Sequence, residues 1–560
     1  MDSHVYESSL AGQDNEFIFE SKFYTSVADN SNGNYQNGIV TFDLSSVANS
    51  GHLVDWSQSY LQIPLVAQVR GFGSINEPQV ANALTMKNFT NLIDSVNVKI
   101  ANVDFVNMVS LTNLDINYKI MSSWSQETLN NVGPSLGIYK DTGLLRPVGV
   151  PDGGSALGVG ECHNEMDPVL FTTADGNGLP NATGSSGQDA FTFNEARIER
   201  SRSVADLTDN TNAYLNQTSA SSMGKNFCVR SGYDITYHIL ATIRLKDMHD
   251  IFRKLPLTRG MYMYLNIRTN CFAKCEMSFV SSKYTSYNSV SSGSTLPFQI
   301  SPIGQGVLVS NNVATQTLTA ELGIGALASN GVKSAHGPNC RLYTCMYQMT
   351  PEKEAEYFSL NPVKRVIFND INVFKLANVA NGASISHLVA TNIARVRSIL
   401  IVPKLSGSVH GATNITDSNL GGKSSLGDVL MSPFSSAGST CAPYAYLNNF
   451  NVLLGSVPFY KENINYSWQQ FLLENRSSNA LNGGVVDEIS SGVLSQEDYY
   501  NGYGFIFVDL SRKQSQARDD EGKSIEIRGT NQSGRTLDFD IVVNFQRELK
   551  VSTSTGGLVW

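Results

Sequence analysis

The sequence predicts a mainly β fold of two consecutive jelly-roll β-sandwiches, a double jelly roll, with long loops and few short helices. Three observations predict it. The chain has 560 residues, more than one hydrophobic core of ordinary size can serve. Its 46 Gly, 23 Tyr and 26 Phe suit strands and turns better than helices. Apolar and polar residues alternate from end to end, which is the pattern of strands with one buried face.

The alternation comes in short runs separated by polar or turn-forming residues. In the first half of the chain it is clearest at residues 40–44, 61–69, 96–100, 239–245 and 261–267. In the second half it returns at residues 343–347, 366–374, 397–402, 505–510 and 537–545. About eight strand-like runs in each half would supply the eight strands of one jelly roll.

A Ser-rich stretch at residues 281–300, SSKYTSYNSVSSGSTLPFQI, separates the two strand-rich blocks. We therefore expect an N-terminal arm at residues 1–25, a first jelly roll at 26–285, a linker at 286–300 and a second jelly roll at 301–560. The arm carries a mostly aromatic, apolar cluster that has no evident partner in its own sandwich: Phe17, Ile18, Phe19, Phe23 and Tyr24. We expect this cluster to dock on a neighbouring subunit.

Helices and large loops are expected to lie outside the sandwiches. Residues 350–358 begin with a Thr-Pro pair that suits a helix start, and residues 466–476 are apolar on one face. Both are predicted to decorate loops. The Gly/Asn/Ser-rich segments 150–225 and 405–445 are too polar for a core and are predicted to be large surface loops.

The charge pattern argues against tight, direct binding of nucleic acid. The net charge is -9, and the first 21 residues contain five acidic residues and neither Lys nor Arg. Tight binding to phosphates needs clustered Lys and Arg. Residues 225–274 hold nine Lys or Arg against three Asp. This basic stretch is interpreted as a solvated or subunit-facing surface rather than a nucleic-acid groove.

The seven cysteines are widely spaced and odd in number, which predicts free thiols rather than a disulfide framework. Polar, acidic residues follow Met1 directly, so no signal peptide is expected. The apolar runs are too short to span a bilayer. These features predict a protein that is made in the cytosol and stays soluble.

Several motifs suggest chemistry but are incomplete. Gly-Lys-Ser occurs at residues 422–424 and 522–524, yet the first glycine of a phosphate loop is replaced by Asp417 or Ala517. Turn glycines are the better interpretation. Cys271 and Cys275, with Cys162-His163 as a second pair, are the strongest metal candidates. No further CxxC or HxxxH pair completes four ligands, so buried thiols are favoured.

Acid–base candidates are also weak. Asp519, Asp520 and Glu521 lie in a stretch rich in Lys and Arg that is typical of a solvated loop, and His238 is interpreted as a satisfied surface histidine within a strand. A glycosidase pair of carboxylates is not specified by anything in the sequence. The sequence therefore predicts no catalytic, cofactor-binding or metal-binding residues, no cofactor and no enzyme.

Ordered landmarks along the chain resemble the major capsid proteins of Polinton-like viruses, adintoviruses and, more distantly, virophages. In the first half these are DWSQSYLQIP at 55–64, NLIDSVNVKIANVD at 91–104 and LKDMHDIFRKLPLTRG at 245–260. The second half adds IARVRSILIVP at 393–403, NNFNV at 448–452, PFY at 458–460, FLLENRSSNALNGG at 471–484, SGVLS at 491–495, YGFIFVDLSR at 503–512 and the closing strand at 541–551. The likeness is patchy before residue 230 and nearly continuous from about residue 340 onward.

The resemblance implies a structural subunit of an icosahedral double-stranded DNA virus, three copies of which form a pseudo-hexagonal homotrimeric capsomer. It further implies contacts with neighbouring capsomers and with penton and minor or cement capsid proteins. The protein would be made in the host cytosol and reside in the virion capsid. The resemblance leaves open whether a membrane lies beneath the shell. A carbohydrate-binding or surface β-sandwich protein and a two-domain β-rich glycoside hydrolase are the alternatives.

Overall fold

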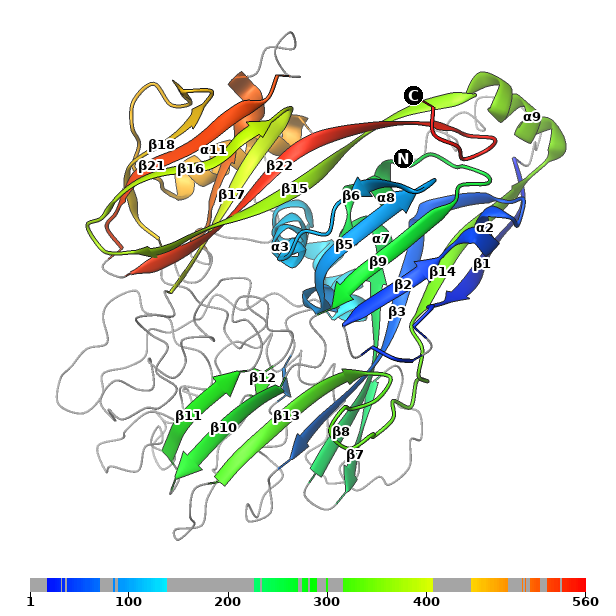
Figure 1. Cartoon of the computed structure of the whole chain (residues 1–560), viewed down its shortest axis with the longest axis horizontal. Helices are drawn as coiled ribbons and strands as arrows, with labels where there is room; N and C mark the ends of the chain where they lie inside the picture. The colour runs from blue at the N-terminus through cyan, green and yellow to red at the C-terminus, as the bar shows by residue number, and fades with distance from the viewer. Residues whose placement is uncertain are drawn as a thin grey trace.

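The computed structural model describes residues 18–31, 33–35, 38–70, 84–85, 89–137, 226–231, 234–269, 274–280, 283–289, 299–300, 316–405, 445–481, 496, 499, 504–513, 521–533 and 536–559. In these residues the fold is mainly β, as predicted, and two sandwiches of antiparallel strands lie side by side (Figure 1).

The first sandwich consists of two sheets of four antiparallel strands. One sheet contains, in spatial order, β1 (Phe19–Ala28), β14 (Arg341–Met349), β3 (Leu53–Arg70) and β8 (Asp234–Arg244). The other contains β2 (Ile39–Asp43), β9 (Met263–Thr269), β5 (Ile93–Ile100) and β6 (Val103–Val106).

The second sandwich is also built from two four-stranded sheets. One contains β15 (Val363–Val379), β22 (Leu537–Ser552), β17 (Val396–Leu405) and β20 (Ile506–Asp509). The other contains β16 (Ser384–Ile393), β21 (Lys523–Asn531), β18 (Leu447–Leu454) and β19 (Val457–Pro458).

The two sandwiches have the same topology. When the eight strands of each are counted in chain order, the sheets run 1-8-3-6 and 2-7-4-5 in both. This order is the jelly roll, in which paired Greek keys wrap a chain into two facing sheets. The double jelly roll predicted from the sequence is therefore present in the strand order itself.

Additional strands extend the first sandwich at one end. The 18-residue strand β3 continues beyond β14 and pairs there with β13 (Gln316–Ile324), and β10 (Lys274–Val280) and β11 (Lys283–Ser289) follow in the same sheet. This extension lies below the first sandwich in Figure 1. Three short strands complete the described set: β7 (Asn226–Ser231) beside β8, and β4 (Leu84–Thr85) paired with β12 (Gln299–Ile300).

Alternating apolar residues build the two cores. Leu61, Ile63 and Leu65 of β3 are fully buried. Phe539 and Ile541 of β22 each have only 1% of their surface exposed. Side chains two residues apart point to the same face of a strand, so this spacing places them together between the sheets. All ten predicted runs fall within or largely overlap strands of the structure.

The boundary between the jelly rolls is not where the sequence predicted it. Residues 286–289 of the predicted linker belong to β11, and β13 and β14, which come after the linker, pair with β3 of the first sandwich. The first jelly roll therefore ends at Met349, and helix α9 (Pro351–Leu360) leads into β15. The Ser-rich composition marked the extension of a sheet rather than a domain boundary.

The prediction of an N-terminal arm over residues 1–25 is wrong from Phe19 onward. These residues form β1, which pairs with β14 in the same chain from Phe19↔Met349 to Ala28↔Arg341. Phe23 packs against the core of its own sandwich. The aromatic cluster thus has an intramolecular partner 300 residues away, which a reading of neighbouring sequence could not find. Residues 1–17 lie outside the described part of the chain.

The described helices are few and short, as predicted. They are α2 (Ser45–Ala48), α3 (Thr112–Ser123), α4 (Gln126–Val132), α7 (Leu245–Met248), α8 (Asp250–Lys254), α9 and α11 (Trp468–Leu481), with 3₁₀ turns at Phe89–Leu92, Gly133–Leu136 and Leu510–Lys513. None of them is long and apolar enough to cross a membrane. The prediction that both anticipated helices only decorate loops is wrong for α11, because its Phe471 and Glu474 are fully buried.

The end of the chain closes back on the first sandwich. The Arg259 N–H donates to the Thr553 carbonyl oxygen at 2.9 Å. Gly556 has φ +64°, and a Cβ there would lie 2.3 Å from the backbone of Met261. Only glycine fits such a position. The turn after β22 therefore packs against the segment between β8 and β9, and this contact joins the two sandwiches.

Candidate functional site

Among the described residues, the phosphate-loop motif at residues 522–524 is not completed. Lys523 is the first residue of β21 and lies opposite Ile393 of β16, so no helix follows Gly522. A phosphate loop needs the N-terminus of a helix at this point. The second Gly-Lys-Ser, at residues 422–424, lies outside the described residues. Asp519 and Asp520 also lie outside them, and Glu521 is exposed.

The cysteine candidates are not brought together within the described residues. Cys275 lies in β10, and its side chain is not described; Cys271, Cys162 and His163 lie outside the described part. Among the described residues, no three His, Cys, Asp or Glu side chains are arranged so that they could hold a metal ion. Cys340 and Cys345 are buried free thiols, as the cysteine spacing predicted for the chain.

His238 is buried rather than on the surface, which corrects the prediction. It lies in β8 with 7% of its surface exposed, and its Nδ1 accepts a hydrogen bond from the Ala335 N–H at 3.2 Å. Burial, with a smaller contribution from His336, lowers the pKa of His238 to about 4. A neutral ring that anchors a neighbouring loop has a structural role.

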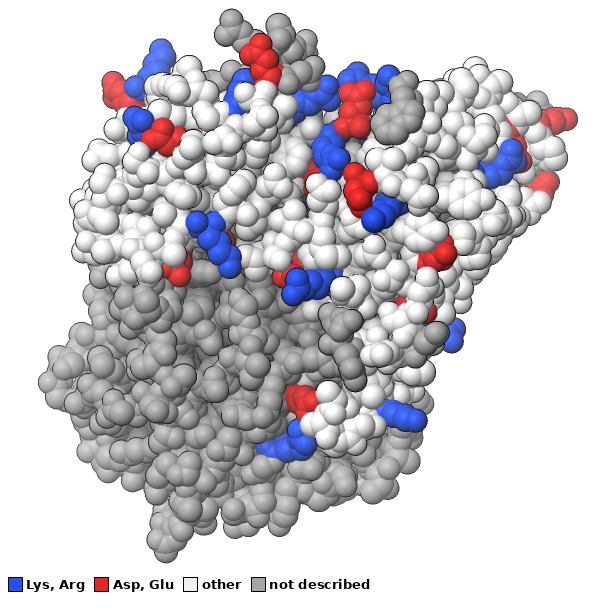
Figure 2. Space-filling view, in the orientation of Figure 1, with Lys and Arg blue, Asp and Glu red and all other residues white. Residues whose placement is uncertain are grey.

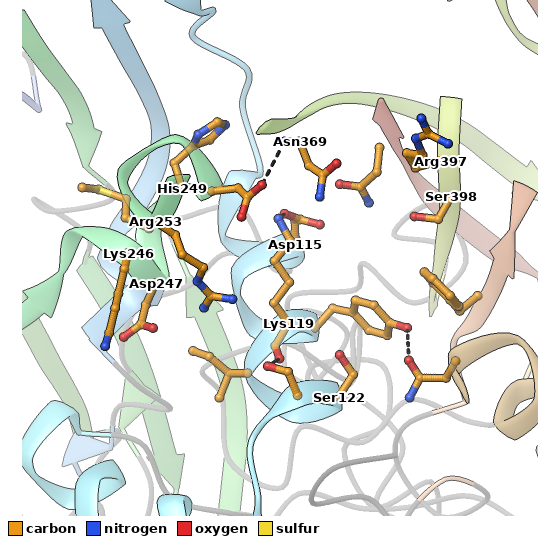
Figure 3. A pocket seen from close by; sticks show the side chains of 18 of the residues that line it. Asp115, Lys119, Ser122, Lys246, Asp247, His249, Arg253, Asn369, Arg397 and Ser398 are labelled. Carbon is orange, nitrogen blue, oxygen red and sulfur yellow. Dashed lines mark hydrogen bonds and ion pairs between the residues drawn. The ribbon is translucent and has the colours of Figure 1, made fainter. Parts of the chain in front are cut away.

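A polar cavity of about 490 Å³ lies where the two sandwiches meet (Figure 3). One wall comes from α3, α7 and α8 of the first sandwich. The other comes from β15, β17, β20 and β22 of the second. Its lining includes Lys119, Asp250, Arg253, Asn369, Ser398 and Asn544. The cavity is the most prominent candidate for a site, and its chemistry follows from the contacts around it.

Helix α3 forms the centre of the junction. The Tyr118 ring stacks on Phe507 at 5.1 Å between centroids and meets Phe505 edge-on at 5.5 Å. Its hydroxyl donates to Asn475 Oδ1 of α11 at 3.0 Å. Burial raises the pKa of Tyr118 well above its usual value, so the phenol stays protonated and remains a donor. One residue of the first sandwich thus contacts both a strand and a helix of the second.

The charges on α3 are paired within the helix. Lys119 Nζ lies 2.5 Å from Asp115 Oδ2, four residues earlier. Burial alone would lower the pKa of Lys119, but the Asp115 and Asp250 carboxylates outweigh it and raise that pKa. Asp250 also accepts the Asn369 N–H of β15 at 3.0 Å. The positive charge of Lys119 is therefore stabilised by the carboxylates of Asp115 and Asp250.

A second contact across the junction centres on Asp370 of β15. Its Oδ1 lies 3.5 Å from His249 Nε2, and its Oδ2 accepts a hydrogen bond from Arg547 Nη1 at 3.1 Å. His249 Nδ1 accepts the Ile251 N–H at 3.2 Å, which places the proton of the neutral ring on Nε2, facing Asp370. Arg547 also donates to the Phe105 carbonyl oxygen of the first sandwich.

The Asp370 carboxylate is stabilised in its charged form. Burial alone would raise its pKa, but the contacts with His249 and Arg547 and the Ile371 N–H lower it. The His249 ring is buried, its Nδ1 accepts the Ile251 N–H, and its Nε2 lies 3.5 Å from Asp370 Oδ1. These contacts join the two sandwiches across the junction.

Three arginines of the basic stretch at residues 225–274 lie beside carboxylates. Arg244 pairs with Asp247 at 2.5 Å, Arg268 lies 3.8 Å from Asp94, and Arg259 pairs with Glu354. On the face shown in Figure 2, Lys and Arg are interspersed with Asp and Glu among the described residues. Such a mixed surface suits solvent or a protein neighbour better than phosphates.

The sequence analysis missed the junction because its residues carry no motif. His249 and Asp250 lie inside the quoted stretch LKDMHDIFRKLPLTRG. His249 faces Asp370, and Asp250 accepts the Asn369 N–H; both partners are more than 100 residues away. Asp247 and Asp250, on either side of His249, were the local signal of a polar contact in this stretch.

Comparison with known proteins finds likeness in structure only. No protein-family model matches the sequence, and no curated protein matches it. The chain is similar to the mavirus major capsid protein, at 11% identity and a TM-score of 0.46, over 100% of this chain and 94% of that one. It is also similar to the Faustovirus major capsid protein, at 10% identity and a TM-score of 0.44, over 97% and 92% of the two chains. A third similar structure is a PBCV-1 virus capsid chain, at 8% identity and a TM-score of 0.39, over 98% and 99%. The strand order, and not these distant likenesses, is the basis for the fold assignment.

Proposed function

We propose that this chain is the major capsid protein of an icosahedral double-stranded DNA virus, a structural subunit without enzymatic activity. The observation that carries the proposal is the repeated strand order, which gives one chain two complete jelly rolls of the same topology. Three copies in a closed ring would then present six similar wedges around one axis, a pseudo-hexagonal capsomer. Closed cyclic assembly is a common solution for identical subunits.

The rigid junction supports this role. A wedge in a shell must keep its two halves in one relative orientation, and Tyr118, Asp370 and Arg547 fix the two sandwiches by aromatic and charged contacts. Beside them, Lys119 of the cavity lining is paired with Asp115. A capsid subunit needs two sandwiches in a fixed relative orientation, whereas an enzyme would need an accessible acid, base or nucleophile.

The sequence landmarks support a finer assignment to the capsid proteins of Polinton-like viruses or adintoviruses. The landmark at residues 471–484 begins on α11, the one at 503–512 includes β20, and the one at 541–551 falls within β22. These elements enclose the core of the second sandwich, so the resemblance is carried by residues that determine the fold.

The partners proposed for this subunit are proteins. They are other copies of itself in the homotrimer, neighbouring capsomers, and penton and minor or cement capsid proteins. We place the chain in the virion capsid after synthesis in the host cytosol.

We predict that binding to double-stranded DNA is weak. The net charge is -9, and Arg244, Arg259 and Arg268 of the basic stretch lie beside carboxylates, which leaves fewer cations to neutralise phosphates. Fluorescence anisotropy should give a dissociation constant above about 1 µM at physiological salt, as for non-specific binding. A nanomolar constant at that salt concentration would contradict the prediction.

Negative-stain electron microscopy of the purified protein tests the proposal directly. Hexagon-shaped trimers or closed shells are expected, and a uniform population of monomers would contradict it. The alternative from the sequence, a carbohydrate-binding or surface β-sandwich protein, predicts monomers that are retained on a carbohydrate resin.

A further inference from the structure

The outer face of the first sandwich carries a row of tyrosines that the described residues leave partly exposed. We call it the tyrosine strip: Tyr24, Tyr60, Tyr343 and Tyr347, on β1, β3 and β14. Tyr60 and Tyr343 stack with centroids 4.9 Å apart, and Tyr24 lies 5.7 Å from Tyr60. The exposed fraction of Tyr24 is 45%.

The residues around the strip extend the same surface. Phe19 is also exposed, and its ring lies 4.7 Å from that of Tyr347. Lys22 Nζ lies 5.4 Å from the Tyr347 ring. Single exposed aromatic residues are ordinary, but a contiguous row of them marks an interaction surface. Tyrosine is also among the residues that carry most binding energy at protein interfaces.

The equivalent face of the second sandwich is already covered inside the chain. The strip lies on the sheet with order 1-8-3-6, and the matching sheet of the second sandwich is β15–β22–β17–β20. The outer side of that sheet, which includes Ser398 and Asn544, faces the junction cavity. Tyr118 of α3 stacks on Phe507 there. Helix α3 lies in the connection between the fifth and sixth strands, β6 and β8, of the first sandwich.

The second sandwich has a helix in the same connection. Helix α11 lies between its fifth and sixth strands, β19 and β20. Phe471 and Glu474 face inward and are fully buried, whereas Leu473 has an exposed fraction of 57%. Most of this apolar side chain is therefore available for contact with a neighbouring molecule. The first sandwich therefore has an exposed outer face on its 1-8-3-6 sheet, and the second has an exposed helix in the connection between its fifth and sixth strands. A sheet face and a helix of these two kinds already contact each other at the junction.

We propose that the tyrosine strip receives the α11 side of the second sandwich of the next copy of this chain. The contact between copies would repeat the contact within each copy, a helix from the fifth connection against the outer face of a 1-8-3-6 sheet. Because the two surfaces differ, the contact is head-to-tail, and three such contacts close a ring. The inference rests on the proposed capsomer and names its contact surfaces.

The test places a charge on each surface separately. Tyr24→Arg changes the strip, and Leu473→Arg changes α11; both side chains are exposed, so the fold should survive. The matched control is Leu388→Arg, on the edge strand β16 with an exposed fraction of 53%. Analytical ultracentrifugation measures trimer dissociation, and circular dichroism with thermal unfolding confirms that each variant is folded.

Each of the two surface variants should weaken trimer association by at least about tenfold, as expected for the loss of an interface hot spot, while the control remains trimeric. If the wild type is trimeric and either surface variant stays trimeric with wild-type affinity, the inference is overturned and the proposed function stands. If the wild type itself is monomeric at micromolar concentration, both fail.

Discussion

Replacement of Phe471 or Phe505 by Ala is expected to destabilise the second sandwich by about 3–5 kcal/mol, the range observed for fully buried phenylalanines. Both rings are completely buried, and their centroids lie 5.2 Å apart in an edge-to-face arrangement. Trp468 and Tyr499 pack around Phe471. Removing either ring leaves a cavity in a close-packed aromatic cluster.

The measurement is denaturant unfolding of each variant, followed by tryptophan fluorescence because Trp468 is in the same cluster. Gln469→Ala is the matched control on the same helix, since its side chain is exposed. It should change stability by no more than about 0.5 kcal/mol. A Phe471→Ala variant that unfolds at the wild-type midpoint would show that the cluster does not support the sandwich. The two phenylalanines touch, so the double variant should not be additive.

Replacement of Asp370 by Ala is expected to cost about 3 kcal/mol and to weaken the junction between the sandwiches. Its side chain is only 3% exposed and accepts from Arg547 while facing His249. Removing one partner of a buried charged pair leaves the other without compensation. Differential scanning calorimetry should resolve the single wild-type transition into two, one for each sandwich. A single unshifted transition would contradict the prediction.

The same contact predicts a dependence on pH. The pKa of Asp370 is lowered in the folded protein, so its contribution to stability is present above the unfolded value, about 3.9. It is lost as the pH falls through the still lower folded pKa. The wild type should therefore lose stability in that acidic range more steeply than Asp370→Asn. Glu526→Gln is a suitable control, because the partner of Glu526, Arg528, is exposed and their ion pair should add little.

The strands could be predicted from the sequence because their signal is local. In β3 and β22, apolar and polar residues alternate within a few residues of sequence, and the apolar ones are buried as predicted. The pairing of β1 with β14 has no local signal. The domain boundary was therefore misplaced: β13 and β14 look like any other strands, and only their pairing partners assign them to the first sandwich.

The helices at the junction were hidden for a related reason. Helix α3, TNLDINYKIMSS, is buried on nearly every side, including Asn113, Asp115 and Asn117. A helix that contacts two sandwiches has no solvent-facing stripe, so it lacks the apolar periodicity by which surface helices are recognised. The junction of Asp370, His249 and Arg547 joins three distant segments and could only be found in the folded chain.

The pairing of β1 with β14 and the clamp at Gly556 determine when a subunit can be complete during synthesis. The ribosome must have made the chain through Met349 before β1 has its partner, and nearly to the last residue before the final turn can close on Met261. Contacts between such distant segments form late and slowly. The first sandwich can therefore be completed only after Met349 has been synthesised, and the orientation of the second sandwich is fixed later still, when Gly556 packs against Met261.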